Sequence, residues 1–329
     1  MSDVSPGTTG VLVMAHGTPA APAEIGAFYT RIRRGHPPSP EQLFDLVRRY
    51  EAIGGTSPLA ARTAAQVSGI AAALERAAPG EFVVRYGAKH TEPLIEDAVA
   101  ALGVAGVRQV VGIVLTPHRA SMGSDEYLDR AEAALLASPG APPLVRVPQW
   151  YDAPGFAELL AERVEAALAR LPAGTGHRTV VFSAHALPER VVAAGDPYPD
   201  QVTASAALVA AAAGLVSAGV AWEVAWQSAG RTPEPWIGPD LLAVLRRLGG
   251  ELRGRAPGGV VVCPVGFVAD HLEVLYDVDV EARAVAESEG LAFCRTDSLN
   301  DDPRFCEILA GVVRRSATPL CRPMGSASG

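Results

Sequence analysis

Apolar segments rich in β-branched residues alternate with helical patterns along the chain, and this alternation most strongly constrains the fold. Strands that alternate with helices form parallel sheets whose two faces are covered by helices. We therefore predict an α/β fold with doubly wound parallel sheets. The predicted strands span residues 11–15, 82–86, 107–115, 144–147, 179–183, 222–226, 260–265 and 291–294, and the predicted helices include residues 58–77, 92–102, 124–137, 156–171, 241–248 and 304–315.

The two halves of the chain resemble each other. Residues 11–16 (VLVMAH) echo residues 180–185 (VVFSAH), and residues 86–93 echo residues 226–235, each ending in Glu-Pro. Two copies are too few for a solenoid, so we predict two similar α/β domains. Proline, glycine and aspartate break the pattern near residues 150–156, where we expect the domains to join.

The charge balance excludes one broad class of function. Lys plus Arg is 28 and Asp plus Glu is 36, for a net charge of -8, whereas nucleic-acid-binding proteins usually carry a basic stripe. With 49% hydrophobic and 19% charged residues, the chain can bury a large core. Residues 1–10 are polar and lack the basic and apolar regions of a signal peptide, so we expect none.

One long segment, residues 201–222, carries no charge and is a candidate membrane span. It consists mostly of alanine with glycine and serine, whereas a span needs about 20 strongly apolar residues. Its larger side chains, Leu208, Val209, Leu215 and Val216, have the spacing of one helix face. We predict a buried helix of a soluble domain.

The cysteines are too few for a disulfide scaffold in a chain of this length, and no CxxC pattern occurs. We expect reduced, structural thiols and no tightly bound cofactor, and we regard an iron–sulfur cluster as the disfavoured alternative. The cysteines are Cys263, Cys294, Cys306 and Cys321.

Histidines follow several predicted strands, where open parallel sheets bind their ligands. Taken singly, His90 and His118 are better explained as structural residues. His16 and His185 follow equivalent strands of the two repeated halves. We therefore predict that these two imidazoles face each other across a cleft between the domains.

Carboxylates gather in residues 265–281, which leave a strand and enter a helix with Asp270 as the expected N-cap. Glu273, Asp277 and Glu281 are spaced i, i+4 and i+8 and share one helix face. Like charges at this spacing destabilise a helix, so we expect a compensating cation. Two interpretations stay open: a solvated acidic face, or a cation path that begins at Glu273. Histidine nitrogen with carboxylate oxygen suits Fe(II) or a similar divalent ion.

Basic residues gather near the N-terminus, at Arg31, Arg33 and Arg34 and again around residues 48–49. The turn GGTSP at residues 54–58 follows, with Ser57 as the expected N-cap of the next helix. Backbone N–H groups at a helix start bind anions. The arginines alone fit a solvated surface, but with this turn they indicate a ligand with several carboxylates. The chain lacks HExxH, GxSxG, P-loop and dinucleotide motifs, which disfavours those classes.

Together these segments resemble the ferrochelatase family, most closely its short, soluble type from Gram-positive and related bacteria that acts on coproporphyrin III. The resemblance extends over residues 10–313. The matching stretches are VMAHGTP (13–19), RYEAIGGTSPL (49–59), SAHALPE (183–189), GDPYP (195–199), WQS (226–228), PWIGP (235–239) and residues 264–277.

The resemblance implies two Rossmann-like domains with a porphyrin cleft between them, which we place at residues 9–152 and 153–302. A C-terminal helix, at about 303–316, is expected to pack back on the first domain. His185 and Glu273 would handle metal and protons on the cleft floor, and Asp277 and Glu281 would continue an acidic ladder, often in a wide-turn helix. The residues that match porphyrin contacts are Tyr29, Ile32, Arg33, Arg49, Tyr50, Ser57 and Tyr127.

The implied reaction inserts Fe(II) into coproporphyrin III and releases two pyrrole protons, so it needs a base. A neutral histidine suits this role near pH 7, and Glu273 beside it would relay a proton or hold the metal. Binding energy from the propionates would support bending of the macrocycle. The expected partners are coproporphyrin III, Fe(II) and a downstream haem-pathway enzyme; we expect a monomer.

Two features bear on the type of ferrochelatase. Residues 30–38 are polar and basic where membrane-associated members carry an apolar lip, which favours a cytoplasmic enzyme and a tetracarboxylate substrate. His16 replaces the tyrosine that serves relatives as the axial ligand of product iron. It is a candidate axial ligand, a candidate second base, or a packing residue.

Three alternative functions stay open. The first is a protoporphyrin IX ferrochelatase. The second is a sirohydrochlorin cobalt or nickel chelatase, although such chains are usually shorter or differently repeated and lack the RY…GGTSP and DHLE combination. The third is a non-catalytic tetrapyrrole carrier, which would require the loss of His185 or Glu273, and both are present.

Overall fold

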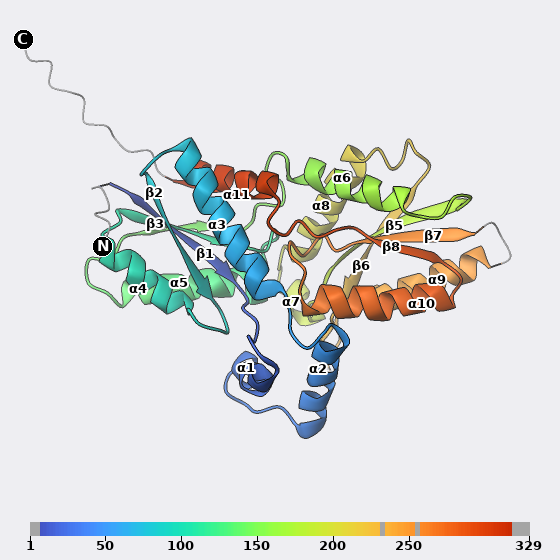
Figure 1. Cartoon of the computed structure of the whole chain (residues 1–329), viewed down its shortest axis with the longest axis horizontal. Helices are drawn as coiled ribbons and strands as arrows, with labels where there is room; N and C mark the ends of the chain where they lie inside the picture. The colour runs from blue at the N-terminus through green and yellow to red at the C-terminus, as the bar shows by residue number, and fades with distance from the viewer. Residues whose placement is uncertain (1–6, 231–233, 254–256, 318–329) are drawn as a thin grey trace, which may run out of the picture.

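Two four-stranded parallel sheets lie side by side in the computed structural model, which describes residues 7–230, 234–253 and 257–317 (Figure 1). Their strand orders, β2-β1-β3-β4 and β6-β5-β7-β8, are the same, which confirms the predicted fold and repeat. Cys321 and part of the second echo, residues 231–233, lie outside the described residues. The strands are β1 (Thr9–Ala15), β2 (Phe82–Ala88), β3 (Gln109–Val114), β4 (Leu144–Val147), β5 (His177–His185), β6 (Ala221–Gln227), β7 (Gly258–Cys263) and β8 (Ala292–Arg295).

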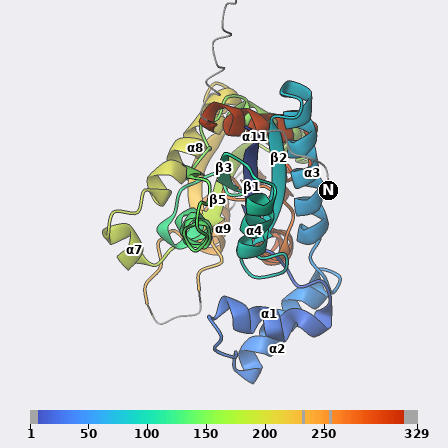
Figure 2. The ribbon, with the colours of Figure 1, turned by 90° about the vertical axis from the view of Figure 1, so that its left-hand side faces the viewer.

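Helices cover both faces of each sheet, as Figures 1 and 2 show. In the first lobe these are α3 (Leu59–Ala77) and α11 (Pro303–Ser316) on one face, and α4 (Ile95–Val104) and α5 (Glu126–Leu136) on the other. In the second lobe, α6 (Phe156–Ala169) and α8 (Tyr198–Ala212) oppose α9 (Leu241–Leu252) and α10 (Arg283–Ser288). The remaining elements are η1 (Pro22–Glu24), α1 (Ile25–Ile32), α2 (Pro40–Ala52), the wide-turn segments η2 (Ser121–Asp125) and η3 (Val274–Ala282), and α7 (Glu189–Ala193).

The strands β1 and β5 lie inside their sheets, each between two neighbours. The chain leaves β1 toward β2 and later crosses to β3 on the other side, and it repeats this course around β5. Such a reversal leaves a crevice at the carboxyl ends of the strands. His16 directly follows β1 and His185 ends β5, so the fold places both imidazoles at such crevices.

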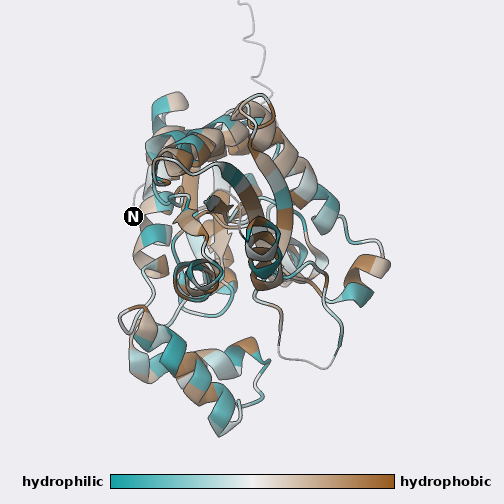
Figure 3. Cartoon of the chain, turned by 90° about the vertical axis from the view of Figure 1, so that its right-hand side faces the viewer, coloured by the Kyte–Doolittle hydropathy of each residue, from teal (hydrophilic) through white to brown (hydrophobic). Residues whose placement is uncertain are grey.

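Burial of apolar side chains on both sheet faces stabilises the two lobes. Figure 3 shows hydrophobic residues gathered on the strands and hydrophilic ones on the outward faces of the helices. The C-terminal helix α11 packs against α3 and against β3 and β4 of the first sheet. Its Phe305 is fully buried, with its ring centroid 5.7 Å from that of Trp150. The predicted contact of this helix with the first lobe is present, and the predicted domain boundary at residue 152 stays a prediction.

The prediction that residues 201–222 place four large side chains on one helix face is wrong. The helix α8 ends at Ala212, where Gly214 adopts a positive φ of 59°. Leu215 N donates to the Ala210 carbonyl and Gly214 N to the Ala211 carbonyl, which is the Schellman pattern that ends helices. Val209 and Leu215 are buried, but Leu208 and Val216 are exposed. Across residues 7–230, 234–253 and 257–317, no helix has the length and apolar character that a membrane crossing demands.

The repeat also differs in detail from the match seen in the sequence. Ala88 N donates to the Pro93 carbonyl at 2.8 Å, and Trp226 N donates to the Pro239 carbonyl at 2.9 Å. The structural counterpart of Pro93 is therefore Pro239, and the match to Pro235 is wrong. The loop after β6 is longer than the loop after β2. The two Glu-Pro pairs therefore do not occupy equivalent positions in the two lobes.

The packing of α11 yields a stability prediction. Phe305→Ala should lower the free energy of unfolding by about 3–5 kcal/mol, because it leaves a cavity between α11 and Trp150. Val104→Ala, at a side chain 83% exposed, should change it by less than about 0.5 kcal/mol. Urea unfolding of both variants measures the difference. A loss below about 1 kcal/mol for Phe305→Ala would contradict this packing.

Candidate active site

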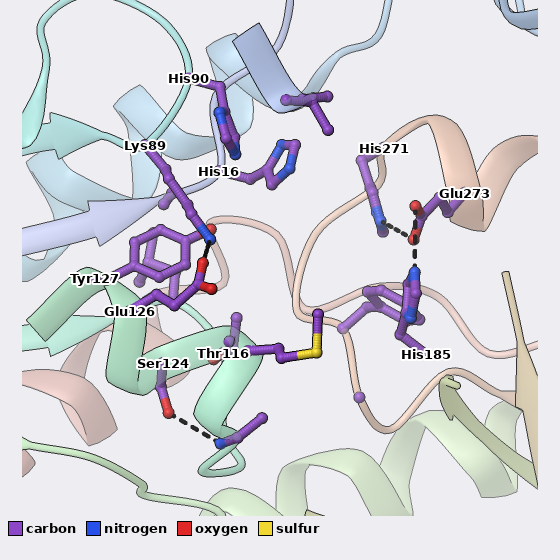
Figure 4. Close-up of a pocket in the computed structure, with 18 of the residues that line it drawn as sticks. His16, Lys89, His90, Thr116, Ser124, Glu126, Tyr127, His185, His271 and Glu273 are labelled. Carbon is purple, nitrogen blue, oxygen red and sulfur yellow. Dashed lines mark hydrogen bonds and ion pairs between the residues drawn. The ribbon is translucent and has the colours of Figure 1, made fainter. Parts of the chain in front are cut away.

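A large cavity of about 1130 Å³ lies between the two lobes, at the carboxyl ends of both sheets. The first lobe contributes residues that follow β1, β2 and β3, together with parts of α1, α3 and α5. The second lobe contributes the end of β5, the start of α7 and residues 266–273. The close-up in Figure 4 shows His16 and His90 on one side and His185, His271 and Glu273 on the other. The predicted cleft with His16 and His185 on opposite sides is therefore present.

Three imidazoles share one arrangement of their ring nitrogens. The Nδ1 atoms of His16, His185 and His271 lie 3.1, 2.6 and 3.0 Å from the carbonyl oxygens of Gly17, Ala186 and Ala269. A carbonyl only accepts hydrogen bonds, so each Nδ1 carries the proton and donates it. In the neutral ring this leaves the lone pair on Nε2. The backbone thus fixes these side chains so that each offers a basic nitrogen.

Glu273 lies between two of these nitrogens (Figure 4). Its Oε1 is 3.8 Å from His185 Nε2, and its Oε2 is 3.9 Å from His271 Nε2. Burial alone would raise the pKa of this carboxyl, but His185, His271 and His16 together lower it to about 2. Glu273 is therefore an anion at neutral pH. The two separations exceed hydrogen-bond length and leave room for a cation between the carboxylate and the imidazoles.

His16 lies in a mainly aromatic environment on the opposite side. Its ring centroid is 4.7 Å from that of His90 and 5.8 Å from that of Phe28. Burial lowers the pKa of His16, and burial together with the nearby charges of His16 and Lys89 lowers the pKa of His90 to about 3. Both rings are neutral near pH 7. His16 can therefore present an Nε2 lone pair to an electrophile in the cleft.

The acidic segment forms a helix of the wide-turn type that the resemblance implied. Its hydrogen bonds over Val274–Ala282 are of the i to i+5 kind, and such segments often mark functional sites. Asp277 is buried within it and accepts hydrogen bonds from Ser228 and from Arg49, whose Nη1 is 3.2 Å away. Arg49 also lies 5.0 Å from the ring centroid of Tyr276. It is the compensating cation that the charge pattern required.

Asp270 does not act as the predicted N-cap. The helical segment begins at Leu272, two residues further along the chain. The Asp270 carboxylate instead accepts hydrogen bonds from Ser298 Oγ at 2.7 Å and Asn300 Nδ2 at 2.9 Å. It also lies 3.3 Å from Arg295. These partners, which are distant in sequence, outcompete the local cap and anchor the loop that carries His271.

The structure separates the predicted porphyrin contacts into two groups. Ile32, Arg33 and Tyr127 line the cavity. Within the described part of the chain, the other four do not line it. Tyr29 lies beneath the Arg33 guanidinium, Arg49 binds Asp277, and the Tyr50 hydroxyl is 3.4 Å from Thr18 Oγ1. Ser57 Oγ accepts a hydrogen bond from Leu59 N, but the N-cap of α3 is Pro58 and not the predicted Ser57.

The sequence assigned no role to the cavity residues His271 and Lys89. His271 stands two residues before Glu273, and this proximity is the signal that could have found it. Lys89 forms an ion pair with Glu126 and lies 5.0 Å from the ring centroid of Tyr127. His118 is buried against Tyr151, and burial lowers its pKa to about 3. It lines the cavity, and neither of its ring nitrogens has a hydrogen-bond partner among the described residues, so its structural role stays a prediction.

The buried carboxyl of Asp277 yields a prediction about pH. Burial and the charge of Glu273 raise its pKa from 3.8 to about 6, so the folded protein binds this proton more tightly than the unfolded chain does. The stabilisation of the folded state by this bound proton is complete below about pH 4 and is lost as the pH rises to about 6. Asp277→Asn should therefore gain stability relative to the wild type over this range, by at most about 3 kcal/mol. Urea unfolding at several pH values measures this, and a difference that stays constant or falls would contradict it.

Comparison with known proteins places the chain in a family. The sequence profile described as "Ferrochelatase" matches residues 8–317. The coproporphyrin III ferrochelatase of Geobacillus kaustophilus (strain HTA426) is 44% identical over 308 residues, which cover 93% of this chain and 95% of the relative. The coproporphyrin III ferrochelatase of Halalkalibacterium halodurans is 42% identical over 307 residues, or 93% and 96% of the two chains.

Solved structures support the same fold. The protein described as SirB from Bacillus subtilis with Fe3+ superposes with a TM-score of 0.57 at 12% identity, over 94% of this chain and 96% of that one. The Deinococcus radiodurans protein DR2241, described as similar to chelatases, gives a TM-score of 0.50 over 95% of this chain and 56% of that one. Given the extent of the profile match and the identity to curated relatives, the chain belongs to the ferrochelatase family.

Proposed function

We propose that this chain inserts Fe(II) into coproporphyrin III and releases iron coproporphyrin for haem synthesis. The observation that carries the proposal is the pairing of an anionic Glu273 with the Nε2 atoms of His185 and His271 across the cleft from His16. The identity of 44% to a curated coproporphyrin III ferrochelatase over nearly the whole chain supports the choice of substrate.

The chemistry requires one divalent cation to enter as two protons leave, so the charge of the macrocycle and metal together is balanced. Glu273 supplies the negative charge that attracts Fe(II) to the cleft floor. The Nε2 atoms of His185 and His271 each carry a lone pair, so the two imidazoles can accept one pyrrole proton each, and Glu273 between them stabilises the imidazolium groups that form. The His185 imidazole and the Glu273 carboxylate are held in position before the substrate arrives. This lowers the reorganisation that the site needs during the reaction.

The rim of the cavity suits an anionic ligand. Arg31, Arg33 and Arg34 line the first-lobe side, and they belong to the polar segment at residues 30–38. Guanidinium groups pair well with carboxylates, and coproporphyrin III carries four. On this proposal the enzyme works in the cytoplasm as a monomer without a resident cofactor and passes its product to a downstream haem-pathway enzyme.

The wild-type protein should insert Fe(II) anaerobically into coproporphyrin III and leave protoporphyrin IX largely unreacted, as measured by loss of the free-porphyrin absorbance bands. Glu273→Gln should lower the rate at least about 100-fold because it removes the anionic partner of His185. It should bind metal-free coproporphyrin III as tightly as the wild type. Glu251→Gln, which removes a carboxylate from α9, is the matched control and should keep full activity.

Each alternative function predicts a different result in this assay. Preferential turnover of protoporphyrin IX would overturn the substrate assignment. Insertion of cobalt or nickel into sirohydrochlorin, with no reaction of either porphyrin, would indicate the other class of chelatase. Tight porphyrin binding without turnover in the wild type would indicate a carrier.

His16 is proposed to ligate product iron through Nε2. His16→Ala should shift the Soret band of bound iron coproporphyrin, because one nitrogen ligand is lost, and added imidazole should restore the wild-type spectrum. His177→Ala, at an exposed position at the start of β5, should leave the spectrum unchanged. An unaltered spectrum in His16→Ala would assign the residue to packing or to base catalysis.

A further inference from the structure

Residues 187–191 and 234–237 of the second lobe form one edge of the cleft, which we call the second-lobe lip. Pro188 and Trp236 pair as an antiparallel bridge. Glu189 N donates to the Pro235 carbonyl at 3.0 Å, and Ile237 N donates to the Leu187 carbonyl at 2.9 Å. These backbone contacts fix the start of α7 relative to the neighbouring loop. Figure 2 shows α7 standing apart from α1 and α2 of the first lobe.

This lip brings a cation to the cavity. Arg190 lines the cavity together with Leu187, Pro188 and Trp236. Its Nε donates to Glu234 Oε2 at 2.7 Å, and the two side chains are 66% and 29% exposed. An ion pair with such exposure contributes little to stability, so Arg190 can exchange Glu234 for another carboxylate at small cost.

The first-lobe arginines hold a different position. Arg31 Nη1 donates to the His90 carbonyl at 3.1 Å, and Arg33 Nε donates to the His36 carbonyl at 3.2 Å, so both are anchored beside α1. Coproporphyrin III carries four propionates around the edge of its ring. When the ring lies between His16 and His185, the propionates that point toward the second lobe lie on the side of the cavity that Arg190 lines. A guanidinium at this position can pair with one of them.

We propose that Arg190 binds a propionate of the porphyrin from the second lobe, and that Glu234 occupies its guanidinium until the substrate arrives. Arg190 is then a specificity-determining residue for substrates with more carboxylates than the first lobe can pair. The inference rests on the proposed function, because it takes coproporphyrin III as the ligand. It adds a contact that the sequence did not indicate.

The test is the dissociation constant of metal-free coproporphyrin III, measured by fluorescence titration of the full chain. Arg190→Gln should weaken binding about tenfold, as expected for the loss of one charge-assisted contact. Arg190→Lys should recover part of this loss. Glu234→Gln should bind as tightly as the wild type or more tightly, because it removes the competing carboxylate. Arg247→Gln, on α9 away from the cavity, makes the same change of charge and should bind like the wild type.

The outcomes separate the two proposals. Unchanged binding in Arg190→Gln, with tight binding by the wild type, would overturn this inference and leave the proposed function intact. Equal weakening by Arg190→Gln and Glu234→Gln would also overturn it, because the ion pair would then act only by shaping the lip. Failure of the wild type to bind coproporphyrin III would overturn the proposed function and this inference with it.

Discussion

The carboxylate of Glu273, held as an anion between His185 and His271, is the interaction on which the site depends. Each imidazole is fixed by a hydrogen bond from Nδ1 to a backbone carbonyl, so its Nε2 cannot turn away without breaking that bond. The Asp270 network with Ser298 and Asn300 holds the loop that carries His271. Much of the surrounding structure can thus be understood as support for one negative charge at the cleft floor.

Internal duplication explains why two histidines meet across the cleft, while the difference between the lobes explains why only one side carries the acid. Both sheets have the same strand order, so His16 and His185 occupy equivalent strand ends. In the strand register, Ile113 of β3 and Cys263 of β7 occupy equivalent positions, and ten residues further along the chain lie Gly123 in the first lobe and Glu273 in the second. The first lobe therefore has no carboxylate at the position that corresponds to Glu273. Because of this asymmetry, the proposed base and the negative charge that attracts the metal both lie in the second lobe. His16 in the first lobe is then available as a ligand of the product iron.

The sequence predicted the strands, the repeat and the facing histidines His16 and His185, because these depend on local periodicity and on position at strand ends. The pairing of His185 with Glu273 came from the family resemblance. The sequence could not predict contacts between distant segments. Asp270 binds the loop after β8 instead of capping the next helix. The cation that the acidic spacing called for is Arg49, which is far from Asp277 along the chain and was predicted to contact the porphyrin. The end of α8 was missed because alanine continues past Ala212, and the positive φ of Gly214 decides the boundary.

On the proposed function, the porphyrin ring lies between His16 on one face and His185 with Glu273 on the other. A crystal structure of the protein with iron coproporphyrin tests it most directly. We predict iron within bonding distance of His16 Nε2, with the opposite face of the ring turned toward Glu273. A ring bound elsewhere in the cleft, or with both histidines on the same face, would contradict the account.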